Sequence, residues 1–328
     1  MDIKNYQNKF WQNLLLGRRY KRWTYLESFA YLMKGVAREL NIAPDFFVEW
    51  YNDIAIREFK RKWLKKDRQK SYFNFNDCKL PDVSNSKEKT HGLMGVFEDV
   101  FLFPCYHNDN YNKSFVLFMD AIMTEGPYGY VDDCIDVRIK KGDIVIDAGA
   151  WIGDFSAYAN SKEAIVYAFE PAEETFHLLC ETKDLNNTNS LFCIKKGLGD
   201  GEYENELLTN RFGYSNTCIT DKDLYGSYMQ MSHDCESSQK EKILITTLDK
   251  FVEENNIARI DFIKADIEGY ERNMLKGASN VLKTFAPKLA ICTYHLVDDP
   301  EVLEKIILEA NPKYTVVHLK HKLFAAVV

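Results

Sequence analysis

The sequence predicts an α/β fold built on a mostly parallel sheet, with a helical segment attached before it. From about residue 140 onward, short β-branched runs alternate with amphipathic helical patterns, which is typical of a parallel sheet covered by helices on both faces. A glycine turn joins the first of these strands to a helix, as in nucleotide-binding sheets. Two strand-like runs, 314–319 and 323–328, end the chain across a short basic turn, so we expect the last strand to run antiparallel.

The first 70 residues differ from the rest in charge and in pattern. They carry 16 Lys and Arg against 8 Asp and Glu, whereas the remainder carries 26 against 41. Apolar residues recur three and four positions apart, as at Phe29, Leu32 and Met33, which predicts two or three helices. The basic excess is either a solvated helix face or a surface for an anionic substrate, partner or membrane headgroup.

We divide the chain into three parts. A helical N-terminal segment covers 1–75, a linker or irregular segment covers 76–115, and the main α/β domain covers 116–328. The middle part is placed on the polar, turn-forming composition of residues 76–92.

The elements of the main domain follow from the length and pattern of each run. Residues 271–282 share one apolar helical face. Another helix begins where Asp299 is placed to cap it, with Pro300 in its first turn. Residues 197–245 interrupt the alternation, and we expect hairpins and a polar loop near the ligand end of the sheet. Five buried strands are expected at 143–148, 164–169, 191–195, 260–265 and 289–293.

Composition excludes several classes of protein. The net charge of −7 argues against a protein that coats nucleic acid, and there is no run of about 18 apolar residues to span a membrane. The first residues are polar, so no signal peptide is expected. The 8 cysteines form no CxxC pair, which favours buried thiols in a reducing compartment. We therefore expect a cytoplasmic protein with no nucleic-acid partner and no transmembrane segment.

The segment 145–155 carries a DxGxxxG motif where a buried strand turns into a helix. Gly149 lets the backbone turn tightly and approach a ligand, and Gly153 lets the start of the helix pack against the strand. Asp147 stands where the dinucleotide fingerprint GxGxxG has its first glycine, and a carboxylate there repels a pyrophosphate but suits a cationic amine. Trp151 lies in the same turn, and we include it among the cofactor-binding residues.

Glu170 ends the second strand, 23 residues after Asp147. An acidic residue at this position accepts hydrogen bonds from ribose hydroxyls. A ribose together with an ammonium group describes S-adenosylmethionine, which is therefore the expected cofactor. The glycine turn alone would also fit a generic strand-to-helix connection, and Glu170 at this interval argues against that alternative.

A second motif, over 260–271, ends a strand with Asp266 and Glu268 beside a glycine. Parallel sheets bind ligands at the carboxyl ends of their strands, so these acids are expected in the site. They are suited to orienting a substrate, acting as a base or holding a divalent cation, and they also fit a solvated strand-to-helix turn. His295 follows the fifth strand and is expected to face the same edge, although a lone histidine is often structural.

These motifs, with FEP at 169–171 and TLDKF at 247–251, resemble the FkbM family of S-adenosylmethionine-dependent methyltransferases over roughly residues 120–328. The resemblance implies a class I methyltransferase (Rossmann-like) fold, a mostly parallel seven-stranded sheet with an antiparallel last strand. It also implies O-methylation of a hydroxyl on a small-molecule, sugar, glycan or secondary-metabolite acceptor, as in polysaccharide biosynthesis. By family position, the residues that match the cofactor motifs are Asp147, Gly149, Gly153 and Glu170.

Methyl transfer to oxygen requires positioning and a base for the hydroxyl proton. We expect His295 to be the base, because its usual pKa suits neutral pH, and Asp266 and Glu268 to orient the acceptor or a metal. Two other classes are a nucleotide-dependent oxidoreductase on a Rossmann-like sheet and a non-catalytic nucleotide-binding module. The DxGxxxG pattern argues against the oxidoreductase. The sequence specifies neither the acceptor nor the oligomeric state.

Overall fold

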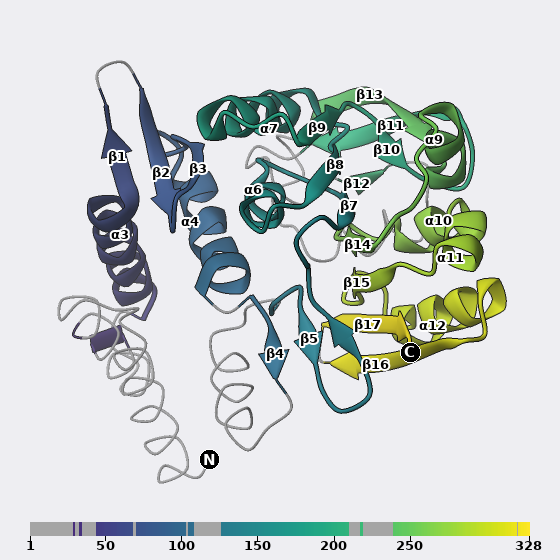
Figure 1. The fold of residues 1–328 in the computed structure, drawn as a ribbon. Coiled ribbons are helices and arrows are strands. Elements are labelled where there is room, and N and C mark those ends of the chain that lie inside the picture. Colours follow the sequence, from purple (N-terminus) through teal and green to yellow (C-terminus); the bar gives the residue numbers. More distant parts are fainter. Residues whose placement is uncertain are drawn as a thin grey trace, which may run out of the picture.

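The computed structural model describes residues 29, 33–34, 44–67, 70–102, 104–107, 126–209, 217–218, 239–319 and 321–328. Figure 1 shows a layered α/β domain with a smaller unit of helices and strands beside it, formed by the chain before residue 103. Of the two or three helices expected within the first 70 residues, the structure describes α3 (Pro44–Trp63). Most of the remaining residues in that segment lie outside the described part of the chain.

The centre of the main domain is a seven-stranded sheet with the order β16-β17-β15-β14-β7-β8-β9. Neighbouring strands are parallel, except that β17 pairs antiparallel with both β15 and β16. The expected mostly parallel sheet with an antiparallel last strand is therefore confirmed. Its strands are β7 (Ile144–Ala148), β8 (Ile165–Phe169), β9 (Leu191–Ile194), β14 (Phe262–Ala265), β15 (Lys288–Cys292), β16 (Tyr314–Leu319) and β17 (Lys322–Val327).

Helices cover both faces of this sheet (Figure 1). On one face lie α6 (Asp154–Ser161) and α7 (Glu173–Asn186). On the other face lie α9 (Leu248–Glu254), α10 (Glu271–Lys276), α11 (Ser279–Thr284) and α12 (Asp299–Ala310).

Successive residues of the strands point into two different cores. In β7, Val145 packs in the core with α6 and α7, whereas Ile146 packs in the core with α9 to α12. Phe262 and Ile263 of β14 divide in the same way. Because both faces are buried, these strands read as continuous apolar runs, which is why the sequence identified them.

Two details of the predicted helices are corrected. The helix expected over 271–282 is broken at Gly277, where a Cβ would lie 1.9 Å from the carbonyl oxygen of Gly199. The close passage of the two backbones separates α10 from α11. The N-cap of α12 is Asp298, which makes no capping hydrogen bond through its side chain, and Asp299 is the first helical residue, with its buried carboxylate ion-paired with an arginine of α10.

The prediction of a helical segment to residue 75 and an irregular segment after it is wrong over 64–102. Three antiparallel strands follow α3, and a helix and a short π-helix follow the strands. These elements are β1 (Leu64–Lys66), β2 (Ser71–Phe75), β3 (Cys78–Pro81), α4 (Lys87–Val96) and η1 (Phe97–Leu102).

Local signals for these elements are present but short. In β2, Phe73 and Phe75 alternate with less buried neighbours and are fully buried, which is a strand pattern only five residues long. Ser86 caps the N-terminus of α4, and its Oγ accepts a hydrogen bond from the Lys89 backbone N–H at 3.1 Å. The sequence between Phe75 and Ser86 is polar, and this composition led to the prediction of an irregular segment.

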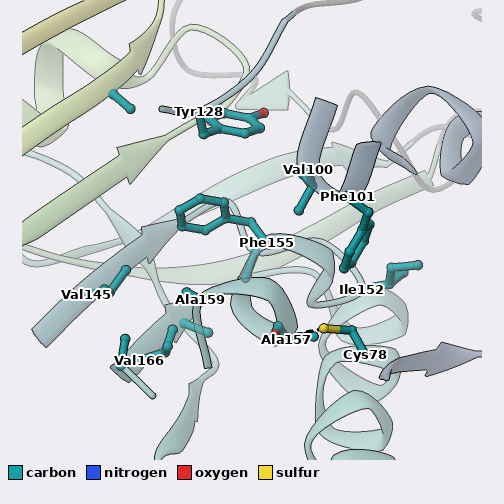
Figure 2. Packing of buried hydrophobic residues seen from close by; sticks show 14 of the residues in the cluster. Cys78, Val100, Phe101, Tyr128, Val145, Ile152, Phe155, Ala157, Ala159 and Val166 are labelled. Atoms are coloured by element: carbon teal, nitrogen blue, oxygen red, sulfur yellow. Dashed lines mark hydrogen bonds between the residues drawn. The ribbon is translucent and has the colours of Figure 1, made fainter. Parts of the chain in front are cut away.

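An aromatic cluster joins this N-terminal unit to the main domain. The ring centroids of Phe75 and Phe101 lie 5.0 Å apart, and Phe101 meets Tyr158 of α6 edge-on at 6.3 Å. Figure 2 shows Phe101 and Cys78 facing α6, with the Cys78 thiol 3.6 Å from the carbonyl oxygen of Ala157. The two parts of the chain therefore share one hydrophobic core.

Two smaller sheets complete the described structure. One has the order β10-β13-β11-β12, and in it β11 pairs antiparallel with both β12 and β13, within the region 197–245 where hairpins were expected. A polar loop was also expected within 197–245, and residues 219–238 of this region lie outside the described part of the chain. Among the helices that the structure describes, none has the length and apolar character to cross a bilayer. The strands of the two sheets are β4 (Tyr106–His107), β5 (Tyr130–Val131), β6 (Asp136–Val137), β10 (Gly197–Leu198), β11 (Tyr203–Thr209), β12 (Thr217–Cys218) and β13 (Gln239–Thr246).

Candidate active site

Four of the predicted site residues lie at one edge of the central sheet. Asp147 is near the end of β7, Glu170 directly follows β8, Asp266 directly follows β14, and His295 follows β15. Because these four strands are parallel, all four residues are at carboxyl ends, where sheets of this kind bind ligands. The structure thus places the cofactor motif and the acidic motif on the same edge.

The turn after β7 depends on two glycines in the left-handed region. Gly149 has a φ of +75°, and a Cβ there would lie 2.0 Å from the carbonyl oxygen of Asp266. The close approach expected toward a ligand is therefore made toward the end of β14. Gly153, with a φ of +85°, faces Leu179 and Thr182 of α7, at 2.8 and 3.0 Å from its ideal Cβ. Gly153 therefore packs against this helix, whereas the sequence had predicted packing against the strand.

The carboxylate of Glu170 holds this turn against the end of β8. Its Oε2 accepts a hydrogen bond from the Trp151 backbone N–H at 2.9 Å, and its Oε1 accepts from Ala172 N at 3.0 Å and Thr175 Oγ1 at 2.8 Å. Burial raises the pKa of Glu170 to about 7, although these hydrogen bonds and Lys264 act in the opposite direction. Oε2 has the capacity to accept a further hydrogen bond.

Asp147 is paired within the protein. It is fully buried, its Oδ2 accepts a hydrogen bond from Ser156 Oγ at 2.6 Å, and its Oδ1 lies 3.1 Å from Lys264 Nζ. The same Nζ donates to the carbonyl oxygen of Gly149 at 2.6 Å. The cationic amine expected opposite Asp147 is therefore, in this structure, the ammonium of Lys264.

The sequence patterns above do not single out Lys264. Burial disfavours its charge, but the carboxylates of Asp147, Asp266 and Asp154 outweigh that effect and raise the pKa of Lys264. Lys264 pairs with Asp147 in the register of β14 and β7. The sequence signal for Lys264 was its place as a charged residue inside an apolar strand, and the structure sets it opposite the carboxylate of Asp147 on the neighbouring strand.

Asp266 is an ionised acceptor held by two tyrosines. Tyr128 donates its hydroxyl to Oδ2 at 2.7 Å, and Tyr294 donates to Oδ1 at 2.9 Å. Burial opposes the charge of this carboxylate, but Lys264 and His295 hold the pKa of Asp266 well below its usual range. The carboxylate therefore stays charged throughout the neutral range.

His295 lies among three carboxylates. Its Nδ1 is 3.2 Å from Glu271 Oε1, and its Nε2 is 3.4 Å from Glu268 Oε2 and 3.8 Å from Asp266 Oδ1. Burial disfavours the imidazolium, but Glu271 and Glu268 raise the pKa of His295 well above its usual value. The predicted group of His295, Asp266 and Glu268 is thus brought together, and Glu271 joins it.

The turn that carries these acids has an unusual backbone. Glu268 has a φ of +56° and Gly269 a φ of +93°, and the left-handed conformation of a non-glycine residue costs on the order of 1–3 kcal/mol. Glu271 Oε1 accepts a hydrogen bond from the backbone N–H of Ile267 at 2.9 Å, which fixes the turn. Glu271 was not singled out from the sequence, although it opens the helix that follows the acidic motif.

A model of the methyltransferase FkbM domain matches residues 147–314 of this chain. The chain is 28% identical over 158 residues to "Methyltransferase 1" of Beauveria bassiana, and 25% identical over 172 residues to "Hexuronic acid methyltransferase AglP" of Haloferax volcanii. These matches cover 45% and 52% of this chain, and each covers 64% of the relative. The chain therefore spans a little less than two thirds of the length of these relatives.

Solved structures of methyltransferases are also similar to this chain. One, described as methyltransferase FkbM from Methylobacillus flagellatus, has a TM-score of 0.44 and 19% identity, over 72% of this chain and 59% of the other. Another is fibrillarin from Aeropyrum pernix with natively bound S-adenosyl-L-methionine, with a TM-score of 0.35 and 14% identity, over 59% of this chain and 70% of the other.

Proposed function

This chain belongs to the methyltransferase FkbM domain family, and we propose that it transfers a methyl group from S-adenosylmethionine to a hydroxyl oxygen of a sugar or glycan acceptor. S-adenosylmethionine supplies the electrophilic methyl group in such a reaction. The observation that carries the proposal is the meeting of the DxGxxxG turn and the acidic cluster at one edge of the sheet. One motif suits the cofactor, and the other suits a polar acceptor.

The residues at the cofactor side fit a nucleoside with a ribose. Glu170 Oε2 has acceptor capacity beyond its hydrogen bond from Trp151, and a ribose hydroxyl is a suitable donor. Gly149 and Gly153 shape the turn on which the nucleoside would lie. The proposed cofactor-binding residues are therefore Asp147, Gly149, Trp151, Gly153 and Glu170, with Asp147 acting through Lys264.

The acceptor is proposed from the chemistry of the cluster and from one relative. Carboxylates and tyrosine hydroxyls hydrogen-bond well to polyhydroxylated molecules, and the relative from Haloferax volcanii is described as a hexuronic acid methyltransferase. A role in polysaccharide biosynthesis, in the cytoplasm, is part of this proposal. A hydroxyl of a secondary metabolite is the second acceptor class, and its methylation also requires a group that accepts the hydroxyl proton.

The catalytic residues of the proposal are His295, Asp266 and Glu268. Methyl transfer by in-line displacement depends mainly on positioning, with proton removal from the hydroxyl contributing about 10²–10⁴-fold. The carboxylates around His295 raise its pKa, so the imidazole holds its proton at neutral pH. The three residues therefore orient the hydroxyl and receive its proton as a group, and the imidazole alone is not a neutral base.

The proposal is tested by binding and by turnover. In calorimetry, S-adenosylhomocysteine should bind at about micromolar level, which is roughly −8 kcal/mol, and NAD should not bind. With methyl-labelled S-adenosylmethionine and a panel of hexuronic acids and sugar nucleotides, label should appear in the acceptor. Tight NAD binding without S-adenosylhomocysteine binding would overturn the proposal in favour of an oxidoreductase.

Variants connect the result to the site. Glu170→Gln should weaken S-adenosylhomocysteine binding by roughly 5- to 100-fold, as expected for a lost charge-assisted hydrogen bond. Glu163→Gln removes an exposed carboxylate far from this edge of the sheet and should leave binding unchanged. Binding without transfer to any acceptor in the panel would favour the non-catalytic binding module.

A further inference from the structure

We propose that Asp266, Glu271 and His295 form a binding site for a divalent first-row transition-metal ion such as Mn²⁺ or Zn²⁺. One ligand atom of each residue lies within 4.8 Å of the ligand atoms of the other two. Asp266 and Glu271 lie at the two ends of the turn between β14 and α10, and His295 follows β15. The turn holds the two carboxylates, and the fold brings His295 to them.

The distances suit a shared ion. Two ligand atoms that each lie about 2.0–2.2 Å from one metal are separated by roughly 3–4 Å. An imidazole binds an ion through one ring nitrogen, and one ring nitrogen of His295, one oxygen of Glu271 and one oxygen of Asp266 all lie within 4.8 Å of one another. One nitrogen and two carboxylate oxygens form a mixed donor set, which favours Mn²⁺, Fe²⁺ or Zn²⁺ over Ca²⁺.

Buried polar atoms in the cluster lack hydrogen-bond partners, which supports a bound cation independently of the distances. Among the described residues, the Glu271 Oε2 atom and both ring nitrogens of His295 have no hydrogen-bond partner. Glu271 is fully buried, and only 8% of the His295 side chain is exposed. The ring nitrogens lie near carboxylates but are not aligned with them as hydrogen bonds. Buried polar groups without partners are destabilising, and a bound cation would satisfy them.

The charge of the cluster favours a cation. Asp266, Glu268 and Glu271 surround a single imidazole, so the group remains negative even when His295 is protonated. Lys264 approaches from the side of β14, but its ammonium already pairs with Asp147. Glu268, whose side chain is 28% exposed, lies on the more open side of the cluster.

If the proposed function holds, the ion would lie on the acceptor side and lower the pKa of the hydroxyl. The O–H bond breaks and the proton passes to Glu268 and then to water. The oxygen forms a bond to the methyl carbon, and the carbon–sulfur bond breaks with its electron pair remaining on sulfur. This role rests on the proposed function, whereas the metal site does not.

Metal binding is measured on the full chain without cofactor or acceptor, so its outcome is separate from the outcome for methyl transfer. After treatment with a chelator and dialysis, Mn²⁺ is titrated and followed by electron paramagnetic resonance, and Zn²⁺ by calorimetry. We expect one ion per chain, with affinity at least 10-fold weaker in Glu271→Gln and His295→Ala, the loss that follows when the residues orienting or forming a metal site are removed. His318→Ala is the matched control, because His318 forms a comparable His–Glu contact with Glu304 at the surface, and it should bind as the wild type does.

Thermal unfolding and S-adenosylhomocysteine binding show whether each variant is folded. Should Glu271→Gln be unfolded, Asp266→Asn replaces it, because the amide keeps the shape of the side chain. The proposal is overturned if neither ion binds the wild type, or if folded Glu271→Gln and His295→Ala bind with unchanged affinity. In that case the positive charges of His295, Lys264 and Lys322 stabilise the carboxylates without an ion.

Discussion

Lys264 on β14 stands opposite Asp147 on β7, and their charged groups lie 3.1 Å apart with almost no exposure to solvent. The pair links the two central strands at the point where the cofactor turn begins. Lys264 Nζ also donates to the Gly149 carbonyl oxygen, so one ammonium connects a carboxylate and the turn. The first prediction concerns the removal of this ammonium.

Lys264→Met should destabilise the protein by about 3–5 kcal/mol, because it leaves the buried Asp147 carboxylate without its charge partner. The measurement is urea unfolding followed by circular dichroism. Adding Asp147→Asn to the same chain should recover part of the loss, since the uncompensated charge is then gone. Lys305→Met, which breaks an exposed pair with Glu309, is the control and should leave stability unchanged. Equal effects of Lys264→Met and Lys305→Met would show that the buried pair is not needed.

The second prediction concerns the pH dependence of cofactor affinity. Burial raises the pKa of Glu170 to about 7, with Lys264 and the hydroxyl of Thr175 acting in the opposite direction. A ribose hydroxyl donates to the ionised carboxylate, so affinity should rise as pH rises through about 7. At one pH unit below the pKa only about a tenth of the carboxyl is ionised, and S-adenosylhomocysteine should bind roughly 10-fold more weakly.

Calorimetry at several pH values between 6 and 8 checks this expectation. Glu170→Gln should bind weakly with little dependence on pH. Asp154, whose pKa burial also raises to about 7, titrates in the same range. A slope that persists in Glu170→Gln would therefore assign the pH dependence to Asp154 and contradict the prediction.

The third prediction separates backbone strain from steric overlap at the cofactor turn. Gly149 and Gly142 have similar φ values of +75° and +80°, but a Cβ on Gly142 meets nothing within 4 Å. Gly142→Ala should cost roughly 1–2 kcal/mol from the left-handed conformation alone. Gly149→Ala should cost about 1–3 kcal/mol more, because its Cβ overlaps the Asp266 carbonyl. Similar unfolding free energies for the two variants would show that the backbone near Asp266 shifts to accept the Cβ without loss of stability.

The fourth prediction tests whether the N-terminal unit and the main domain unfold together. Phe75 is fully buried and lies close to the rings of Phe97 and Phe101. Phe75→Ala should cost about 3–5 kcal/mol and lower the midpoint of a single calorimetric transition. Phe46→Ala removes a ring that is 62% exposed on α3 and is the control, with little expected change. Two separate transitions, with only the first one shifted, would show that the shared core does not couple the parts.

The sheet was predictable because its signals are local. Each central strand is buried on both faces and reads as an apolar run, and each of the five predicted strands lies within two residues of its observed bounds. The glycine turn was also visible, because Gly149 and Gly153 mark left-handed positions. In contrast, β2 and β3 form a short hairpin within a polar stretch of sequence, and the burial of their apolar side chains depends on a core shared with residues distant in sequence.

The position of the site could be predicted from the sequence, but the side chains that contact Asp147 and Asp266 could not. Strand ends placed Asp266, Glu268 and His295 at one edge. The partner of Asp147 depends on the register between β7 and β14, which no local pattern gives. Tyr128 reaches Asp266 across 138 residues of sequence, and such a contact follows only from the folded chain.

The hydrogen bond from Tyr128 to Asp266 also shows that the site extends beyond the residues that match the family. The family match begins at residue 147 and ends at 314, yet Tyr128 lies before it, and the strand β17 lies after it between β15 and β16. A fragment cut at the boundaries of the match would lack a tyrosine of the site and an interior strand of the sheet. The stretch that matches the family is therefore shorter than the stretch that forms the central sheet and the site.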